Sequence, residues 1–240
     1  MQENKENQNM ESEEPIIKEK DADKFKSGDY MIYNSKSNGN IICRVLYEAN
    51  SDYGLQIISD KNVKNVTLGS DNFSLALSSY NNAIERLNNE AMMYLNADYA
   101  LNARCVGSNP IDKTIEENVY KEKNTSISAK IGDNNSTEDV NQMKNIGILK
   151  SNDAYWLASR WFLPKVSASG SYYEYFYMRI VYTNGEADYG IMFRIQSNTT
   201  NSDMYGSVTY GLRPCFKLDT DIIKITCGDG TSQNPYIIGI

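Results

Sequence analysis

The sequence predicts an α+β fold in which antiparallel sheets are combined with one long amphipathic helix and extensive loops. Short runs rich in β-branched and aromatic residues, separated by Gly, Asn and Ser, are typical of antiparallel strands. One stretch, 70–96, has apolar residues at helical spacing, whereas 121–141 is polar and has no period. With 240 residues the chain can bury a core without disulfides, and we expect one domain over 28–240.

The first 27 residues differ in composition from the rest of the chain. They are mostly Asn, Gln, Glu, Lys and Asp, and such a segment buries too little apolar surface to offset the entropy lost on ordering. We therefore expect 1–27 to be a disordered arm or linker, or the cut end of a longer protein.

Three strands are predicted at the start of the domain. The segments 29–33, 41–47 and 53–58 are rich in Tyr, Ile and Val and are bounded by turn residues. The Asn38-Gly39 step between the first two favours a tight hairpin. An antiparallel sheet follows from this pattern.

The segment 70–96 is predicted to be one amphipathic helix behind a cap at Ser70 and Asp71. Its apolar residues fall at i, i+3, i+4 and i+7 spacing: Phe73, Ala76, Leu77, Tyr80, Ile84, Leu87, Ala91 and Leu95. We expect this apolar side to pack on the sheet and the polar side to face solvent. A long loop is predicted over 121–141, and a shorter helix over 137–146, where acidic residues suit a helix start.

The last third of the chain is rich in tyrosine. Nine of the 18 tyrosines lie between Tyr155 and Tyr210, interleaved with Ser, Asn, Thr, Asp and Gly. The segments 175–182 and 186–194 flank Asn184-Gly185 and are predicted to form a hairpin. In the first strand Phe176, Met178 and Ile180 share one face and Tyr175, Tyr177 and Arg179 the other, so one of these two faces must belong to the core.

Three motifs in this region carry a resemblance to a known family: 153–160 (DAYWLASR), 210–218 (YGLRPCFKL) and 228–236 (GDGTSQNPY). With 103–108 (ARCVGS) and 147–150 (GILK), they resemble C-type-lectin-fold domains of the formylglycine-generating-enzyme-like branch. That branch includes the bacterial and phage variable proteins of diversity-generating retroelements. The resemblance implies a C-type-lectin-like fold whose segment of about 159–210 carries exchangeable surface residues that bind a target.

Composition supports the same interpretation without the family. Tyrosine mixed with Ser, Asn and Gly is also typical of antibody loops, because tyrosine offers a large contact at low rotamer entropy. The plainer alternative is that tyrosine is an ordinary strand former here. The candidate ligand-binding residues are Trp161, Tyr173, Tyr175, Tyr177, Tyr182, Asn184, Glu186, Asp188, Tyr189, Phe193, Arg194 and Tyr205.

Residues within the motifs are assigned to the scaffold: Trp156, Arg160, Arg213 and Pro214. Trp156 is expected in the core. The two arginines are expected to anchor turns by donating hydrogen bonds to backbone carbonyls or to a buried carboxylate.

Charge and residue types disfavour several classes of function. A net charge of −7 repels nucleic acid and anionic lipid, and no stretch is apolar enough to insert directly into a membrane. The chain has no histidine, the commonest general base and metal ligand. The calcium motifs of C-type lectins, Glu-Pro-Asn or Gln-Pro-Asp with Trp-Asn-Asp, are missing from the sequence. We therefore expect no metal, no cofactor and no catalysis.

The resulting hypothesis is a non-catalytic recognition protein that binds a protein or glycan on a cell surface. Its expected location is extracellular, on a bacterial cell surface or a phage particle. One alternative is a structural subunit of a phage tail or pilus-like assembly. A less favoured alternative is a formylglycine-generating-type enzyme using Cys215 and Cys227 as a reactive pair, although no catalytic motif surrounds them. The same two cysteines could instead be bonded to each other or be free thiols.

Overall fold

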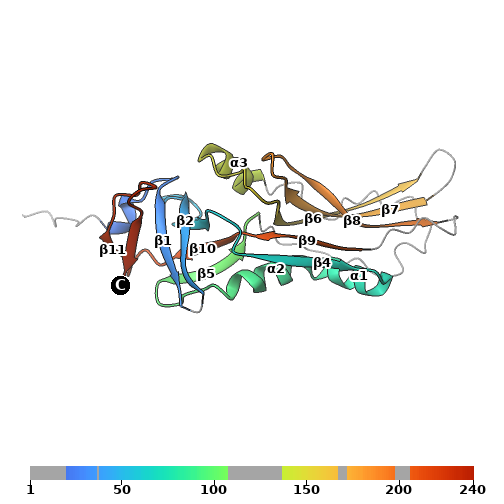
Figure 1. Cartoon of the computed structure of the whole chain (residues 1–240), viewed down its shortest axis with the longest axis horizontal. Coiled ribbons are helices and arrows are strands. Elements are labelled where there is room, and N and C mark those ends of the chain that lie inside the picture. The colour runs from blue at the N-terminus through green and yellow to red at the C-terminus, as the bar shows by residue number, and fades with distance from the viewer. Residues whose placement is uncertain (1–19, 37, 108–136, 167–171, 198–205) are drawn as a thin grey trace, which may run out of the picture.

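The computed structural model describes residues 20–36, 38–107, 137–166, 172–197 and 206–240. The described chain is an elongated α+β structure made of a seven-stranded sheet, a five-stranded sheet and three α-helices (Figure 1). Most strand pairs are antiparallel; β1 with β12 and β6 with β9 are parallel. The predicted α+β class is therefore confirmed.

The seven-stranded sheet contains both the start and the end of the described chain. Its strands, in order across the sheet, are β11 (Lys224–Cys227), β12 (Tyr236–Gly239), β1 (Tyr30–Ser35), β2 (Gly39–Tyr47), β3 (Gln56–Ser59), β10 (Pro214–Leu218) and β5 (Ala100–Cys105). One cluster of buried side chains, including Met31, Val45, Ile57 and Phe216, lies against this sheet.

The predicted N-terminal hairpin is present. Strands β1 and β2 pair from Tyr30–Arg44 to Ser35–Gly39, and the backbone N–H of Asn38 donates to the carbonyl of Ser35 at 2.9 Å. Gly39 has φ +73°, a conformation that other L-residues adopt at a cost. The third predicted strand, 53–58, begins later than expected, since β3 starts at Gln56.

The end of the predicted N-terminal arm is folded. A 3-10 helix runs over Asp21–Lys24, and the side chains of Ala22 and Phe25 are fully buried. The ring of Phe25 meets that of Tyr236 edge-on at 5.2 Å. The disordered arm predicted over 1–27 is thus too long at its C-terminal end, because a few apolar residues among the polar ones find a core to pack on. Its remainder, 1–19, lies outside the described residues.

The five-stranded sheet forms the other half of the molecule. Its order is β4 (Lys64–Ser70), β9 (Gly206–Leu212), β6 (Tyr155–Val166), β7 (Tyr172–Val181) and β8 (Ala187–Ser197). Strand β6 meets β9 only at Tyr155 and Gly211, so the β4–β9 ribbon and the β6–β7–β8 strands diverge from there (Figure 1).

The predicted long helix over 70–96 is wrong. The segment begins in strand β4, and two shorter helices follow, α1 (Phe73–Asn81) and α2 (Ala83–Met92), which meet at Asn82 with φ −98° and ψ 5°. Asparagine is a poor residue for a helix interior. The cap is Asn72, whose side chain accepts from the N–H of Leu75 at 3.2 Å, not Ser70 or Asp71. Apolar side chains of both helices enter one core.

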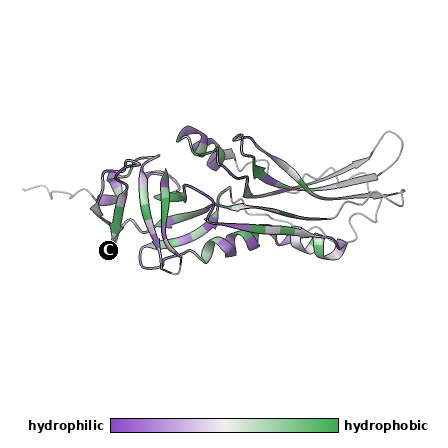
Figure 2. Ribbon diagram, in the orientation of Figure 1, coloured by the Kyte–Doolittle hydropathy of each residue, from purple (hydrophilic) through white to green (hydrophobic). Residues whose placement is uncertain are grey.

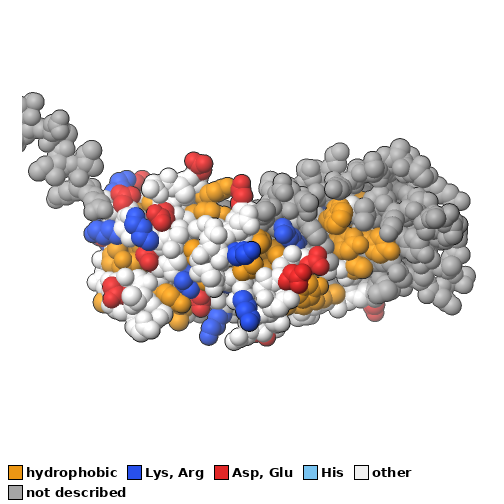
Figure 3. Space-filling model, turned by 90° about the horizontal axis from the view of Figure 1, so that it is seen from above, with side chains coloured by type: hydrophobic (Ala, Val, Ile, Leu, Met, Phe, Trp, Pro, Cys, Tyr) orange, Lys and Arg blue, Asp and Glu red, His pale blue; other side chains and the backbone are white. Residues whose placement is uncertain are grey.

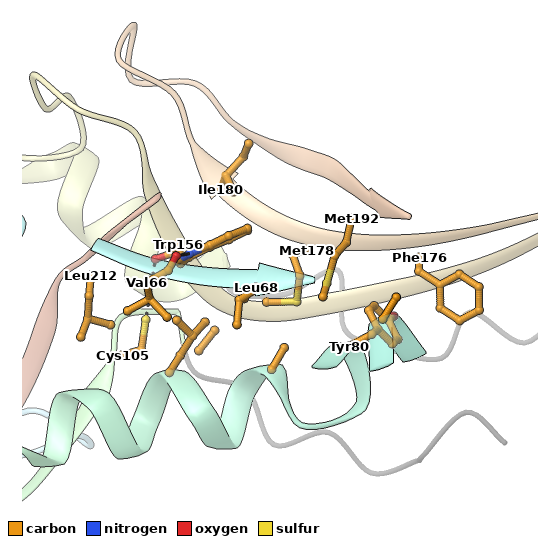
Figure 4. Close-up of a cluster of buried hydrophobic side chains, with 14 of the residues drawn as sticks. Val66, Leu68, Tyr80, Cys105, Trp156, Phe176, Met178, Ile180, Met192 and Leu212 are labelled. Atoms are coloured by element: carbon orange, nitrogen blue, oxygen red, sulfur yellow. Dashed lines mark hydrogen bonds between the residues drawn. The ribbon is translucent and has the colours of Figure 1, made fainter. Parts of the chain in front are cut away.

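That core fills the space between the two helices and the five-stranded sheet (Figure 4). It contains Val66, Tyr80, Trp156, Phe176 and Met178, each at most 3% exposed. The indole N–H of Trp156 donates to the carbonyl of Val66 at 2.8 Å, so the buried polar atom is satisfied. Hydrophobic and hydrophilic residues both occur along α1 and α2, as expected of helices with one buried side (Figure 2).

The predicted second helix is present as α3 (Thr137–Asn145). It overlaps the end of the loop predicted over 121–141, so that loop is shorter than expected; 121–136 lies outside the described residues. Val140 and Met143 of α3 are buried in a third cluster that joins Leu46 of the seven-stranded sheet to Leu157 of the five-stranded sheet. The two sheets are thereby packed into one body.

Candidate functional site

Strand β7 separates a buried face from a half-exposed one, as its alternation predicts. Phe176, Met178 and Ile180 are at most 1% exposed and belong to the core. Tyr175 and Tyr177 are half-buried and point to the opposite side of the sheet. The outward tyrosines therefore lie on a strand whose opposite face is packed in the core.

Aromatic rings stack along this outward side. The rings of Trp161 and Tyr177 lie 5.4 Å apart at an interplanar angle of 26°, and those of Tyr175 and Tyr177 lie 5.7 Å apart at 20°. Trp161 of β6 is paired with Tyr177 in the strand register, which explains the contact. We define the aromatic face as Trp161, Tyr175, Tyr177 and Ile191.

Ile191 joins the aromatic face through the regular register of the β7–β8 hairpin, and a bulge in β8 follows it. Tyr177 pairs with Ile191 and Phe176 with Phe193, so Met192 is the extra residue. Met192 is 4% exposed and packs in the core, while Ile191 is 46% exposed. The space-filling view shows hydrophobic side chains at the surface of this end of the molecule, beside residues drawn in grey (Figure 3).

The turn between β7 and β8 is tightly hydrogen-bonded. The N–H of Tyr182 donates to the carbonyl of Glu186, and the N–H of Gly185 to the carbonyl of Tyr182, both at 2.9 Å. The Asn184 side chain accepts from the N–H of Glu186 at 2.9 Å. Gly185 has φ +85°, as this turn requires, and an added Cβ would lie 3.3 Å from that of Lys150. The predicted Asn-Gly hairpin is confirmed.

Two phenols of this region, those of Tyr177 and Tyr182, have a raised pKa and stay neutral at physiological pH. Burial raises the pKa of Tyr177, and the neighbouring Tyr175 and Asp188 raise it further. Burial likewise raises the pKa of Tyr182, with Tyr210, Asp188 and Glu186 adding to the effect. Each hydroxyl can therefore both donate and accept a hydrogen bond to a ligand.

The structure brings together part of the predicted ligand-binding set. Trp161, Tyr175 and Tyr177 lie on the aromatic face, and the exposed residues of the turn end are Tyr182, Asn184, Glu186 and Asp188. Tyr173, Tyr189, Phe193 and Arg194 lie on β7 and β8, but their side chains are outside the described residues, as is all of Tyr205. Ile191 lies outside the predicted set, although the regular hairpin register pairs it with Tyr177 and so places it on the same face.

Among the residues assigned to the scaffold, Trp156, Arg160 and Arg213 are at most 3% exposed. The guanidinium of Arg160 donates to the carbonyl of Tyr80 at 2.9 Å and lies 4.8 Å from that residue's ring centroid. Pro214 is buried at the start of β10, where it pairs with Cys105. Arg160 thus joins β6 to the end of α1.

Arg213 is fully buried between two loops. Its guanidinium donates to the carbonyls of Ser59 at 2.6 and 2.9 Å, of Asp60 at 3.1 Å and of Ile148 at 2.7 Å. It also lies 5.0 Å from the ring centroid of Tyr155. Burial lowers the pKa of Arg213, partly offset by Tyr155 and Asp60. A buried cation satisfied mainly by carbonyls fastens both loops to β10.

The two cysteines considered as a pair are neither bonded nor adjacent. Cys215 is buried on β10 and Cys227 is exposed on β11, and both are free. Four strands lie between β10 and β11, a separation of about 24 Å along a sheet, whereas a disulfide requires Cα atoms about 5.5 Å apart. Burial raises the pKa of the Cys215 thiol to about 12.

Among the described residues, no group of three or more His, Cys, Asp or Glu side chains is arranged to hold a metal ion. In the same part of the chain, no helix has the length and hydrophobicity needed to cross a bilayer.

Comparison of the chain with protein-family models, with curated proteins and with solved structures finds no match.

Proposed function

We propose that this protein is a non-catalytic recognition protein that binds a protein or glycan on a cell surface through the aromatic face and the adjoining turn. The observation that carries the proposal is the stack of Trp161, Tyr177 and Tyr175 on the outer side of a sheet whose inner side is fully packed.

The chemistry of the face suits recognition. Tyrosine and tryptophan provide large contact areas and lose little rotamer entropy on binding, because each has only two side-chain torsions. The strand register and the underlying core hold the rings in place before a ligand arrives, which reduces the ordering cost of association. Exposed Asn184, Glu186 and Asp188 at the turn supply the polar rim that such sites commonly have.

The finer proposal is a C-type-lectin-like fold with a variable segment of about 159–210, as in proteins diversified by retroelements. Strands β6, β7 and β8 all fall within or largely within that segment, so exchange of its outward residues would alter the face and leave the core alternation intact. The flanking DNA provides the test. A near-copy of the coding segment that differs mainly at adenines, beside a reverse transcriptase gene, is the expected finding.

Binding is tested with alanine variants of the aromatic face. Fluorescently labelled protein is measured on a panel of whole bacterial cells and on a glycan array, with Tyr53→Ala as the control at a tyrosine elsewhere that is 39% exposed. We expect Trp161→Ala and Tyr177→Ala each to weaken binding about thirtyfold, equivalent to about 2 kcal/mol. Their midpoints of thermal unfolding should stay near that of the wild type; large destabilisation would instead assign both side chains to the core.

A structural subunit of a surface assembly remains the competing proposal, favoured by the exposed Ile191 and Tyr182 beside the stack. Permanent packing of this face against a second subunit would give a stable oligomer. Light scattering of purified protein separates the two proposals, since we expect a monomer over micromolar concentrations. An oligomer that Tyr177→Ala dissociates would support the structural subunit.

A further inference from the structure

A pocket away from the aromatic face has the features of a second binding site. It has a volume of about 350 Å³, and two loops, 60–62 and 147–153, form it together with Tyr30 of β1 and Arg44 of β2. This volume lies within the range of pockets that hold small molecules.

Arg213 fixes both loops. Its guanidinium donates to the carbonyl of Asp60 in one loop and to the carbonyl of Ile148 in the other, and both residues line the pocket. The guanidinium is fully buried, so displacement of either carbonyl would break a charge-assisted hydrogen bond. The pocket is therefore preformed.

Cations predominate around it, although the chain as a whole has a net charge of −7. Arg44, Lys61 and Lys150 line the pocket, and Asp60 and Asp153 are its carboxylates. The Arg44 side chain is held by the carbonyl of Gly28 at 2.7 Å, so it has a defined position. Buried Arg213 adds a further positive charge, giving four cationic groups and two anionic ones.

The two lysines have no carboxylate partner among the residues that the structure describes. Lys61 and Lys150 are exposed, and neither makes an ion pair within the part of the chain that the structure describes. Arg44 approaches Asp60 only to 3.7 Å. Two ammonium groups at one pocket repel each other until an anion lies between them.

The remaining lining groups identify the rest of the ligand. Asn62, Ser151 and Asn152 offer hydrogen-bond donors and acceptors, and Asp60 and Asp153 only accept. A bare anion would leave the two carboxylates without a donor, and a neutral sugar would leave the lysines without an anion. We propose that this pocket binds a small polyhydroxylated anion, such as a sugar that carries a carboxylate or phosphate group: the acid lies between Lys61 and Lys150, and hydroxyls donate to the two carboxylates.

This site does not depend on the aromatic face, since Trp161, Tyr175, Tyr177 and Ile191 do not line it. The test is a titration of the full chain, followed by NMR and calorimetry, with glucose 6-phosphate and with glucuronate. Glucose alone and inorganic phosphate alone are the matched half-ligands. We expect a Kd of about 1 mM or tighter for at least one sugar acid. Each half-ligand should bind at least about tenfold more weakly than the sugar acid. The NMR chemical-shift changes on binding should concentrate in residues 60–62 and 147–153.

Variants then locate the binding. The double variant Lys61→Ala/Lys150→Ala should weaken the sugar acid at least about tenfold, whereas Lys144→Ala, an exposed lysine outside the pocket, should not. Binding should also weaken as sodium chloride is raised, because salt screens the lysines. Three outcomes would overturn the proposal: no saturable binding of either sugar acid up to about 10 mM, equal affinity for phosphate alone, or unchanged affinity in the double variant.

Discussion

Single residues determine how the loops of this molecule are held, and Arg213 is the clearest case. One fully buried guanidinium satisfies three backbone carbonyls, those of Ser59, Asp60 and Ile148. Without it the carbonyls of Ser59 and Ile148 would lose this donor in a buried setting, which costs about 1–3 kcal/mol for each unsatisfied group. The residue therefore contributes to the fold and to the preformed pocket at once.

We expect Arg213→Met to lower the free energy of unfolding by about 4 kcal/mol or to prevent folding, since removal of a buried charged hydrogen-bonding group belongs to the most destabilising class of substitution. Urea unfolding at pH 7 gives the measurement. Arg86→Ala, at an exposed arginine of α2, is the control and should change stability by less than about 0.5 kcal/mol. Equal stability of the two variants would contradict the role assigned to Arg213.

A single glycine defines the turn of the predicted recognition hairpin. Gly185→Ala should lower the free energy of unfolding by about 1–2 kcal/mol. The φ of +85° is unfavourable for alanine, and the added Cβ would make a close contact with Lys150. Gly39→Ala, with φ +73° and no neighbour within 4 Å of the added atom, separates the backbone cost from the contact. Urea unfolding gives the loss of unfolding free energy for each variant, and the difference between the two losses measures the contact with Lys150 alone. A larger loss for Gly39→Ala than for Gly185→Ala would contradict a cost from this contact.

At the scale of elements, α3 is attached to the sheets by the apolar contacts of Val140 and Met143 and by the buried carboxylate of Asp139. Asp139 pairs with Arg104 at 2.6 Å and accepts from the N–H of Gly107 at 2.7 Å and from the hydroxyl of Tyr47 at 2.9 Å. Burial alone would raise the pKa of Asp139, but Arg104, with Gly107 and Tyr47, more than offsets it and holds this pKa below its ordinary value. The folded state therefore favours the ionised carboxylate.

This favours a pH dependence of stability. A group whose folded pKa is lowered stabilises the protein above its unfolded pKa, about 3.9 for aspartate, and loses that contribution as pH falls through the folded value. We expect Asp139→Asn to lower the free energy of unfolding by about 3 kcal/mol at pH 7. Below about pH 4, the stability of this variant should depend less on pH than that of the wild type. Thermal unfolding from pH 3 to 7 tests this, with exposed Asp153→Asn as the control. Parallel profiles for wild type and Asp139→Asn would contradict it.

At the scale of the whole molecule, the third cluster joins the two sheets. Leu46, Ile58 and Cys215 of the seven-stranded sheet share it with Leu157 and Val181 of the five-stranded sheet. Such a shared core favours cooperative unfolding of the whole chain rather than of each sheet in turn.

We therefore expect a single unfolding transition. Both tryptophans, Trp156 and Trp161, lie on β6 of the five-stranded sheet, so their fluorescence reports that sheet alone, whereas far-UV circular dichroism reports both. The two signals should have the same midpoint in urea. An earlier fluorescence midpoint would mean that the two sheets unfold as separate units.

The amino-acid sequence by itself determined the local features: the α+β class, the Asn-Gly hairpins, α3 and the division of β7 into two faces. Each follows from interactions between neighbours along the chain, such as the alternation of Phe176 and Tyr177 or the positive φ of Gly39 and Gly185. Residues far apart in sequence do not enter these features.

The tertiary structure alone decided the rest. Residues of both α1 and α2 enter the core beside the five-stranded sheet, and a bulge against β7 places Met192 in that core as well. Strand order sets the distance between Cys215 and Cys227. It also brings loops 60–62 and 147–153 together around Arg213. Packing between distant segments sets these features, and no periodicity along the chain encodes it.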